Sequence, residues 1–102
     1  MKLAKTQQEE ASKLRNQLNI MGVMFDASGS IINYAQATAS ALATYNEAVQ
    51  KYNAGLIDEA TFTIPEKFYE QFKNLLNRYD TLYSLIFLHF LNYFINIILL
   101  YF

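Results

Sequence analysis

Only one group of residues in this chain has types and spacing that could support specific polar chemistry. His89, Asn92 and Asn96 interrupt an otherwise apolar stretch. Their spacings of three and then four residues place them on one face of a helix. Such a polar face could pair with a second helix through hydrogen bonds, or form an ionisable site inside a membrane. The other interpretation is that these are tolerated polar positions, or positions that face protein rather than lipid.

The other residue types do not combine into a catalytic or metal-binding site. His89 is the only histidine and has no Cys, Asp or Glu beside it, which makes a poor set of metal ligands. The chain has no cysteine, which excludes thiol nucleophiles, cysteine zinc sites and disulfides. The sequence beginning at Asp26 does not match a calcium-binding loop. Its glycine, Gly29, comes too early, and Ala37 stands where the last ligand, a glutamate, is needed. We therefore expect no catalytic, cofactor-binding or metal-binding residues, and no enzyme.

Composition and charge exclude further classes of function. With 8 basic and 9 acidic side chains, the chain lacks the basic stripe that nucleic-acid binding requires. Its polar N-terminus, MKLAKTQQEEASK, is not a secretory signal. Gly is scarce and Pro occurs once, whereas Ala, Leu, Gln and Glu are plentiful, a composition that favours helices. We expect one all-α domain with neither a nucleic acid nor a small-molecule substrate as its partner.

The polar face lies within the segment Thr81–Phe102, which follows the last charged residue, Asp80. As a helix this segment would be roughly 33 Å long, close to the ~30 Å hydrocarbon core of a bilayer. Because Lys67, Lys73 and Arg78 precede it, a membrane span here would keep the N-terminal side in the cytoplasm. AT-rich coding sequence read out of frame produces the same residues, so a non-native tail from a truncated or frame-shifted gene is the alternative.

Residues 1–80 are predicted to form an amphipathic helical hairpin and the start of a third helix. The first helix should run from Lys2 to about Phe25, followed by a turn over residues 26–30. Apolar or weakly polar residues recur in it at heptad-like spacing, as in a coiled coil, at Ala4, Gln7, Ala11, Leu14, Leu18, Met21 and Phe25. The second helix should begin at Ser30 or Asn33 and end before Gly55, whose conformational freedom suits a helix C-terminus.

The second helix is expected to fold back antiparallel on the first. Its own predicted seam consists of Ala35, Thr38, Leu42, Tyr45, Val49 and Tyr52, and continues to Leu56. Small residues crowd its first half and large residues its second half. In an antiparallel pair the small half would meet the large residues that end the first helix, and the reverse would hold at the other end.

The third helix is expected to begin near Pro65, with Thr63 as its N-cap, and to continue unbroken to Phe102. Its predicted seam consists of Phe68, Phe72, Leu75, Tyr79, Leu82 and Ile86. The first two helices can cover only about its first half. The second half would need lipid, a partner chain or aggregation to bury its apolar surface.

Two stretches of sequence resemble a helical segment of bacteriophage tail tape-measure proteins, over roughly residues 14–83. They are LRNQLNIMGVMFDASGSIINYAQATASALATYNEAVQKYNAG and FYEQFKNLLNRYDTLYS, with the pairs Tyr45-Asn46 and Tyr52-Asn53. The resemblance implies a structural role in a virion, with no catalytic residues. The chain departs from that family in being far shorter and in turning apolar at Ser84, and both departures fit a truncated gene.

Two hypotheses for function follow. The first is a non-enzymatic structural or interaction protein of the virion or host cytoplasm, whose helices bind partner helices or copies of itself. The second is a single-pass, tail-anchored membrane protein with a cytoplasmic helical hairpin, of which a small phage lysis protein of the holin type is a variant.

Overall fold

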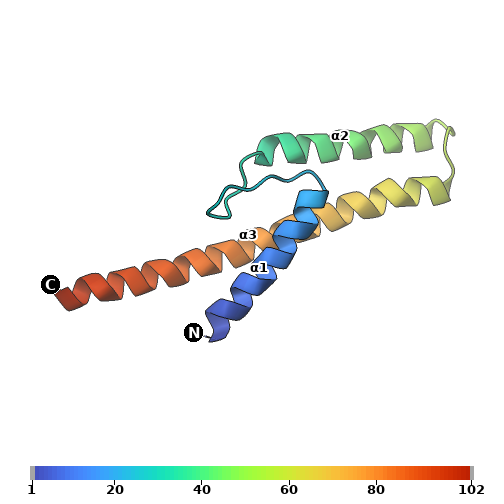
Figure 1. The fold of residues 1–102 in the computed structure, drawn as a ribbon. Helices are drawn as coiled ribbons and strands as arrows, with labels where there is room; N and C mark the ends of the chain where they lie inside the picture. The colour runs from blue at the N-terminus through green and yellow to red at the C-terminus, as the bar shows by residue number, and fades with distance from the viewer. Residues whose placement is uncertain (1, 102) are drawn as a thin grey trace.

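A computed structural model describes residues 2–101 and the side chains of residues 5–101. Ala4, expected at the start of the first seam, and Phe102, expected at the end of the apolar segment, therefore lie outside the described side chains. The described residues form three helices: α1 (Lys2–Ile20), α2 (Tyr34–Asn53) and α3 (Glu59–Tyr101). The molecule is elongated, with extents of 68 × 24 × 18 Å, and α3 runs along its whole length (Figure 1).

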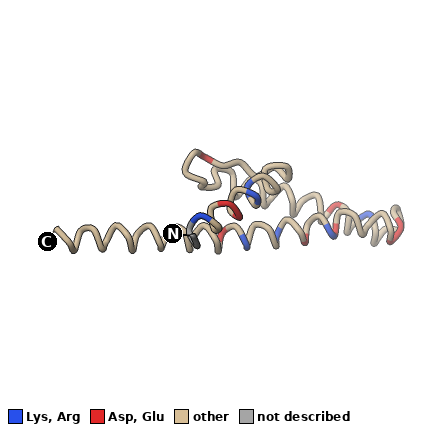
Figure 2. The backbone as a smooth tube through the Cα atoms, turned by 60° about the horizontal axis from the view of Figure 1, so that its bottom comes forward, with Lys and Arg blue, Asp and Glu red and all other residues tan. Residues whose placement is uncertain are grey.

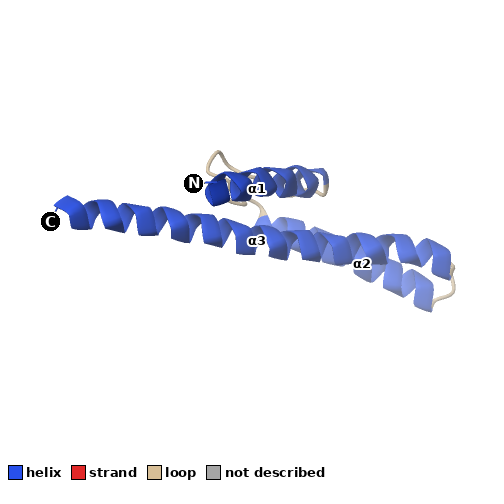
Figure 3. Ribbon diagram, turned by 90° about the horizontal axis from the view of Figure 1, so that it is seen from below, coloured by secondary structure: helices blue, strands red, loops and turns tan. Residues whose placement is uncertain are grey.

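The fold class is confirmed: the described chain is all-α, and its long third helix ends in an apolar segment. An antiparallel hairpin is present, but α2 and α3 form it. The pairing within the hairpin is not the expected one. α2 packs antiparallel on α3, and no Cα atoms of α1 and α2 come within 8 Å of each other in the described chain. Figures 1 and 3 show α1 and α2 against different faces of α3.

The physical reason for this pairing is that α3 presents two neighbouring apolar stripes. Arg15 and Glu10 of α1 contact Tyr79 and Arg78, so α1 covers the stripe around Tyr79. The second stripe faces α2, where rings stack between the helices. The stacked pairs are Tyr45–Tyr69 and Tyr52–Phe62, each with centroids 4.8 Å apart. The core therefore forms around α3, and its buried members are Ala11, Leu14, Leu18, Val23, Ala37, Phe72, Leu75, Leu76, Tyr79 and Leu82.

α1 ends earlier than the sequence indicated, at Ile20 rather than near Phe25. Gly22 has φ +97°, a left-handed conformation that stops the helix. The amide of Val23 then donates to the carbonyl of Leu18 at 3.0 Å, and the amide of Gly22 donates to Asn19 at 3.1 Å. This pattern of backbone bonds is a Schellman motif, and the buried side chains of Leu18 and Val23 supply its apolar contact.

The connection between α1 and α2 is an ordered loop rather than a simple turn. Phe25 and Ile31 form an antiparallel bridge within it. The Asp26 carboxylate accepts bonds from the Ser28 amide and the Ser30 amide, each at 2.9 Å, as expected of a turn-forming aspartate. The Ser28 hydroxyl bond to this carboxylate, followed by the amide bonds, lowers the pKa of Asp26. The loop folds over α3 instead of directing α2 back along α1.

The seam of α2 lies about one position away from the expected one. Ala37 and Ala48 are its buried residues, whereas Leu42 and Tyr52 of the expected seam are exposed. α2 therefore presents two small residues, Ala37 and Ala48, to α3, while the rings of Tyr45 and Tyr52 from the expected seam also stack on α3. Gly55 ends α2 as predicted, with φ +73°, and the Leu56 amide donates to the Lys51 carbonyl at 2.9 Å.

α3 begins at Glu59, earlier than expected, and Pro65 lies inside it. Asp58, not Thr63, caps the helix, because its carboxylate accepts the Thr61 amide at 2.8 Å. The contact with Thr61 also lowers the pKa of Asp58. The seam of α3 is confirmed at its centre, where Phe72, Leu75, Tyr79 and Leu82 are buried, while Phe68 is exposed.

Candidate functional site

The C-terminal part of α3 extends beyond the rest of the molecule, residues 2–83, which we call the body. No charged residue follows Asp80 and no glycine or proline follows Pro65, so nothing in the sequence stops the helix. Figure 2 shows this part of the tube without any basic or acidic residue, whereas both kinds are spread over the rest of the chain. We call residues 84–101 the apolar segment.

Large apolar side chains of the apolar segment are exposed all around the helix. The exposed set consists of Leu85, Phe87, Leu88, Phe90, Tyr93, Phe94, Ile95, Ile98, Leu99, Leu100 and Tyr101. The exposed fraction is 62% at Phe90 and 84% at Leu100, although side chains of these types are usually buried. Scattered exposed apolar residues are ordinary on a protein surface, but a continuous apolar cylinder needs something to cover it.

The dimensions of the apolar segment suit a bilayer. By helical rise, residues 84–101 extend for about 27 Å, against a hydrocarbon core of about 30 Å. α3 is the one helix in the described chain that is long and apolar enough to cross a membrane, and its most apolar window has no buried part. A core helix of a soluble protein would be largely buried in such a window.

His89, Asn92 and Asn96 lie where the sequence placed them, on one face of the apolar segment and exposed. None of the three makes a hydrogen bond to another residue between 5 and 101. A shallow depression on this face is lined by Leu85, Leu88, His89, Leu91, Asn92 and Ile95. The described residues include no group of His, Cys, Asp or Glu that could hold a metal ion. This face can form hydrogen bonds but has no second titratable group for chemistry.

Polar and charged side chains gather where the apolar segment meets the body. Arg78 forms an ion pair with Glu10 of α1 at 3.2 Å, and both side chains are about half exposed. Desolvation raises the pKa of Asp80, the last acidic residue of α3. The Tyr83 hydroxyl lies 3.0 Å from the Ser30 hydroxyl of the loop. The body thus ends in polar groups directly beside the apolar segment.

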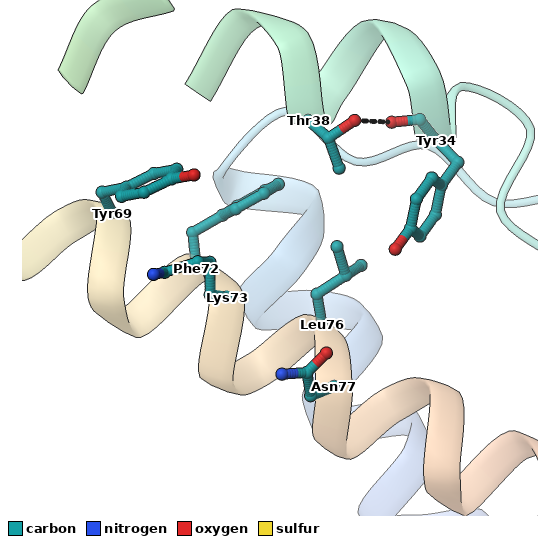
Figure 4. A pocket seen from close by; sticks show the side chains of 7 residues that line it. All are labelled: Tyr34, Thr38, Tyr69, Phe72, Lys73, Leu76 and Asn77. Atoms are coloured by element: carbon teal, nitrogen blue, oxygen red, sulfur yellow. Dashed lines mark hydrogen bonds between the residues drawn. The ribbon is translucent and has the colours of Figure 1, made fainter. Parts of the chain in front are cut away.

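The cleft between α2 and α3 is a second place where a site could lie. Figure 4 shows the side chains that line it, which are Tyr34, Thr38, Tyr69, Phe72, Lys73, Leu76 and Asn77. Its one internal hydrogen bond joins the Thr38 hydroxyl to the Tyr34 carbonyl at 2.9 Å, within α2 itself. The Lys73 ammonium lies 4.8 Å from the centroid of the Tyr69 ring. This cleft has no acid, base or nucleophile arranged for a reaction, and aromatic packing accounts for its contacts.

Sequence reasoning missed the contacts of Tyr79. Its ring is buried and packs edge-on against Phe25, with centroids 5.1 Å apart. Its hydroxyl donates to the Gly29 carbonyl and lies 3.4 Å from the Arg15 guanidinium. The seam spacing identified Tyr79 as a core residue, but no local signal linked it to a loop so distant in sequence.

The chain matches no protein-family model, and neither curated proteins nor solved structures yielded a match.

Proposed function

We propose that this is a non-enzymatic, single-pass membrane protein, in which the apolar segment crosses a bilayer and the helical body lies at one surface. One observation supports the proposal above all. The apolar segment is long enough to span the hydrocarbon core and is not buried against any other part of the described chain. Water would leave this surface unfavourably hydrated, whereas lipid covers it without requiring a partner.

The distribution of basic residues favours a cytoplasmic body. Lys67, Lys73 and Arg78 lie on α3 just before the apolar segment, within the distance over which positive charge orients a span. Tyr83 and Tyr101 lie at the two ends of the apolar segment, and tyrosine is enriched at both membrane interfaces. The body then presents the α1 and α2 surfaces to cytoplasmic partners.

Membrane flotation tests the proposal. The full chain should float with vesicles in a density gradient and resist carbonate extraction. The matched control is the variant Phe94→Lys/Ile95→Lys, which keeps the length of α3 but places two charges near the middle of the apolar segment, where each is costly. This variant should remain at the bottom of the gradient. Sedimentation of the wild-type chain away from the vesicles, whether as an aggregate or as a dissolved protein, would refute a membrane span.

A structural role in a virion is the second candidate. It is favoured by the single helix of 43 residues that runs along a molecule 68 Å long. This role requires that other helices, rather than lipid, cover the apolar segment. A wild-type chain that forms defined soluble oligomers without detergent, and that ignores vesicles, would support this second candidate over the first.

A further inference from the structure

We propose that the face containing His89, Asn92 and Asn96 binds the same face of a second copy, which makes the membrane-spanning segment a parallel dimer. This inference rests on the proposed membrane span. The contact face extends by one leucine at each end and consists of Leu85, His89, Asn92, Asn96 and Leu99. We call these five residues the seam.

The spacing of the seam matches helix pairing. Its residues follow one another at intervals of four, three, four and three, the heptad pattern that keeps one stripe facing a partner helix. Leucines close the seam at its two ends and polar side chains occupy its middle. Leu85 and Leu99 are 48% and 68% exposed, so both are free to pack against another helix.

The chemistry of the seam favours an identical partner. In hydrocarbon, a side-chain amide without a hydrogen-bond partner is strongly unfavourable. Each asparagine amide contains both a donor NH₂ and an acceptor oxygen, so the same side chain on a second copy complements it. An imidazole in its neutral form, such as His89 can supply, likewise has one donor and one acceptor nitrogen. A two-fold axis along the seam pairs these groups with one another.

The body leaves the seam accessible. Along the same side of α3, towards its N-terminus, lie the exposed residues Gln71, Asn74, Arg78 and Thr81. α1 and α2 cover other faces of α3, where Phe72, Leu76 and Tyr79 are buried. A second copy can therefore contact the seam beyond Leu85, where neither helix covers α3, while Glu10 of α1 borders the seam at Leu85 itself. Glu10, 3.2 Å from Arg78, partly neutralises the charge that Arg78 would present to its counterpart.

Membrane orientation selects a parallel pair. Copies inserted in the same direction place identical residues at the same depth, so Asn92 meets Asn92 and Asn96 meets Asn96. In coiled coils, a buried asparagine at such a position fixes the register and favours dimers. An unrelated helix would have to supply polar groups at matching depths to serve equally well.

Cysteine cross-linking in vesicles tests the pairing, because the chain has no cysteine of its own. Leu99→Cys places one thiol in the seam, and Ile98→Cys places one thiol at nearly the same depth on another face. Both variants are first shown by flotation to insert. Oxidation should then convert most Leu99→Cys protein to a disulfide-linked dimer and leave Ile98→Cys largely monomeric. Equal cross-linking of the two variants would overturn the seam as the contact face.

The polar residues are tested by replacing them with leucine, which keeps the segment apolar enough to insert. Asn92→Leu/Asn96→Leu should weaken dimerisation by about tenfold or more, measured by energy transfer between labelled chains as lipid is added. Phe94→Leu, on another face, should leave the dissociation constant unchanged. A wild-type chain that inserts but stays monomeric overturns this inference and leaves the membrane span intact. A wild-type chain that does not insert overturns both.

Discussion

Gly29 is the residue at which the loop between α1 and α2 is held against α3. Its φ is +89°, a left-handed conformation that other residues adopt at a cost. A Cβ atom at this position would lie 3.0 Å from the Tyr79 hydroxyl and 3.3 Å from the ring of Tyr83. The Gly29 carbonyl also accepts the hydrogen bond of buried Tyr79. The backbone conformation and the close approach therefore both require glycine here.

We predict that Gly29→Ala lowers the free energy of unfolding by about 1–3 kcal/mol, because the residue would be strained and Tyr79 displaced. Thermal and urea unfolding of the full chain in mild detergent, followed by circular dichroism, measure this change. Gly55→Ala is the matched control, since Gly55 also has a positive φ, of +73°, but open space around its Cβ position. A larger loss in Gly55→Ala than in Gly29→Ala would contradict the proposed contact.

At the scale of the element, α3 begins at Glu59, before its proline at Pro65. Asp58 caps the helix and Glu59 lies in its first turn, where a negative charge is favourable. Pro65 has no amide hydrogen, so the carbonyl of Thr61 loses its helical partner. The aromatic contacts of Phe62 with Tyr45 and Tyr52 hold this first part of the helix against α2. Tertiary packing therefore allows the helix to begin before the local start signal at Pro65.

Pro65→Ala is predicted to stabilise the protein by about 1–3 kcal/mol, because it restores a backbone hydrogen bond and removes a steric conflict inside a helix. The change is measured as a rise in melting temperature by circular dichroism. Lys67→Ala, an exposed substitution in the next turn, serves as the control and should change stability little. If α3 instead began at Pro65, the proline would suit its position and replacing it would bring no gain.

At the scale of the whole molecule, the chain divides into a body and the apolar segment. Every buried apolar residue of the described core precedes Ser84, with Leu82 as the last. Ile86 packs against the core only in part, and beyond it the apolar segment contacts neither α1 nor α2 closely enough to bury its own side chains. The body therefore has its own hydrophobic core, and the apolar segment contributes little to it.

Deleting residues 84–102 should leave a soluble, helical protein. The stability of the body should fall by no more than about 1 kcal/mol, because only the partial contact of Ile86 is lost. Circular dichroism and sedimentation of the shortened chain in buffer without detergent check this prediction. Loss of helical signal, or of a cooperative thermal transition, would mean that the body needs the apolar segment in order to fold.

The sequence by itself determined the features that depend on neighbours along the chain. Gly55 ended α2 where a left-handed residue was expected, and the charge boundary at Asp80 marked the start of the apolar stretch. The 3–4 spacing of Leu75, Tyr79 and Leu82 identified core positions. These features follow from backbone conformation, solvation and helical periodicity, which are local properties.

Only the tertiary structure decided which helices pair and through which residues. The size pattern of α1 and α2 suited an antiparallel pair, yet α3 offered both helices a larger apolar surface and each packed on it instead. The seam of α2 then lay at Ala37 and Ala48 rather than at Leu42, since small side chains allow a close approach to the rings of α3. Several pairings of the helices are compatible with the same spacing of apolar residues. The choice among them depends on the total area that each pairing buries, and the sequence of a single segment does not contain that information.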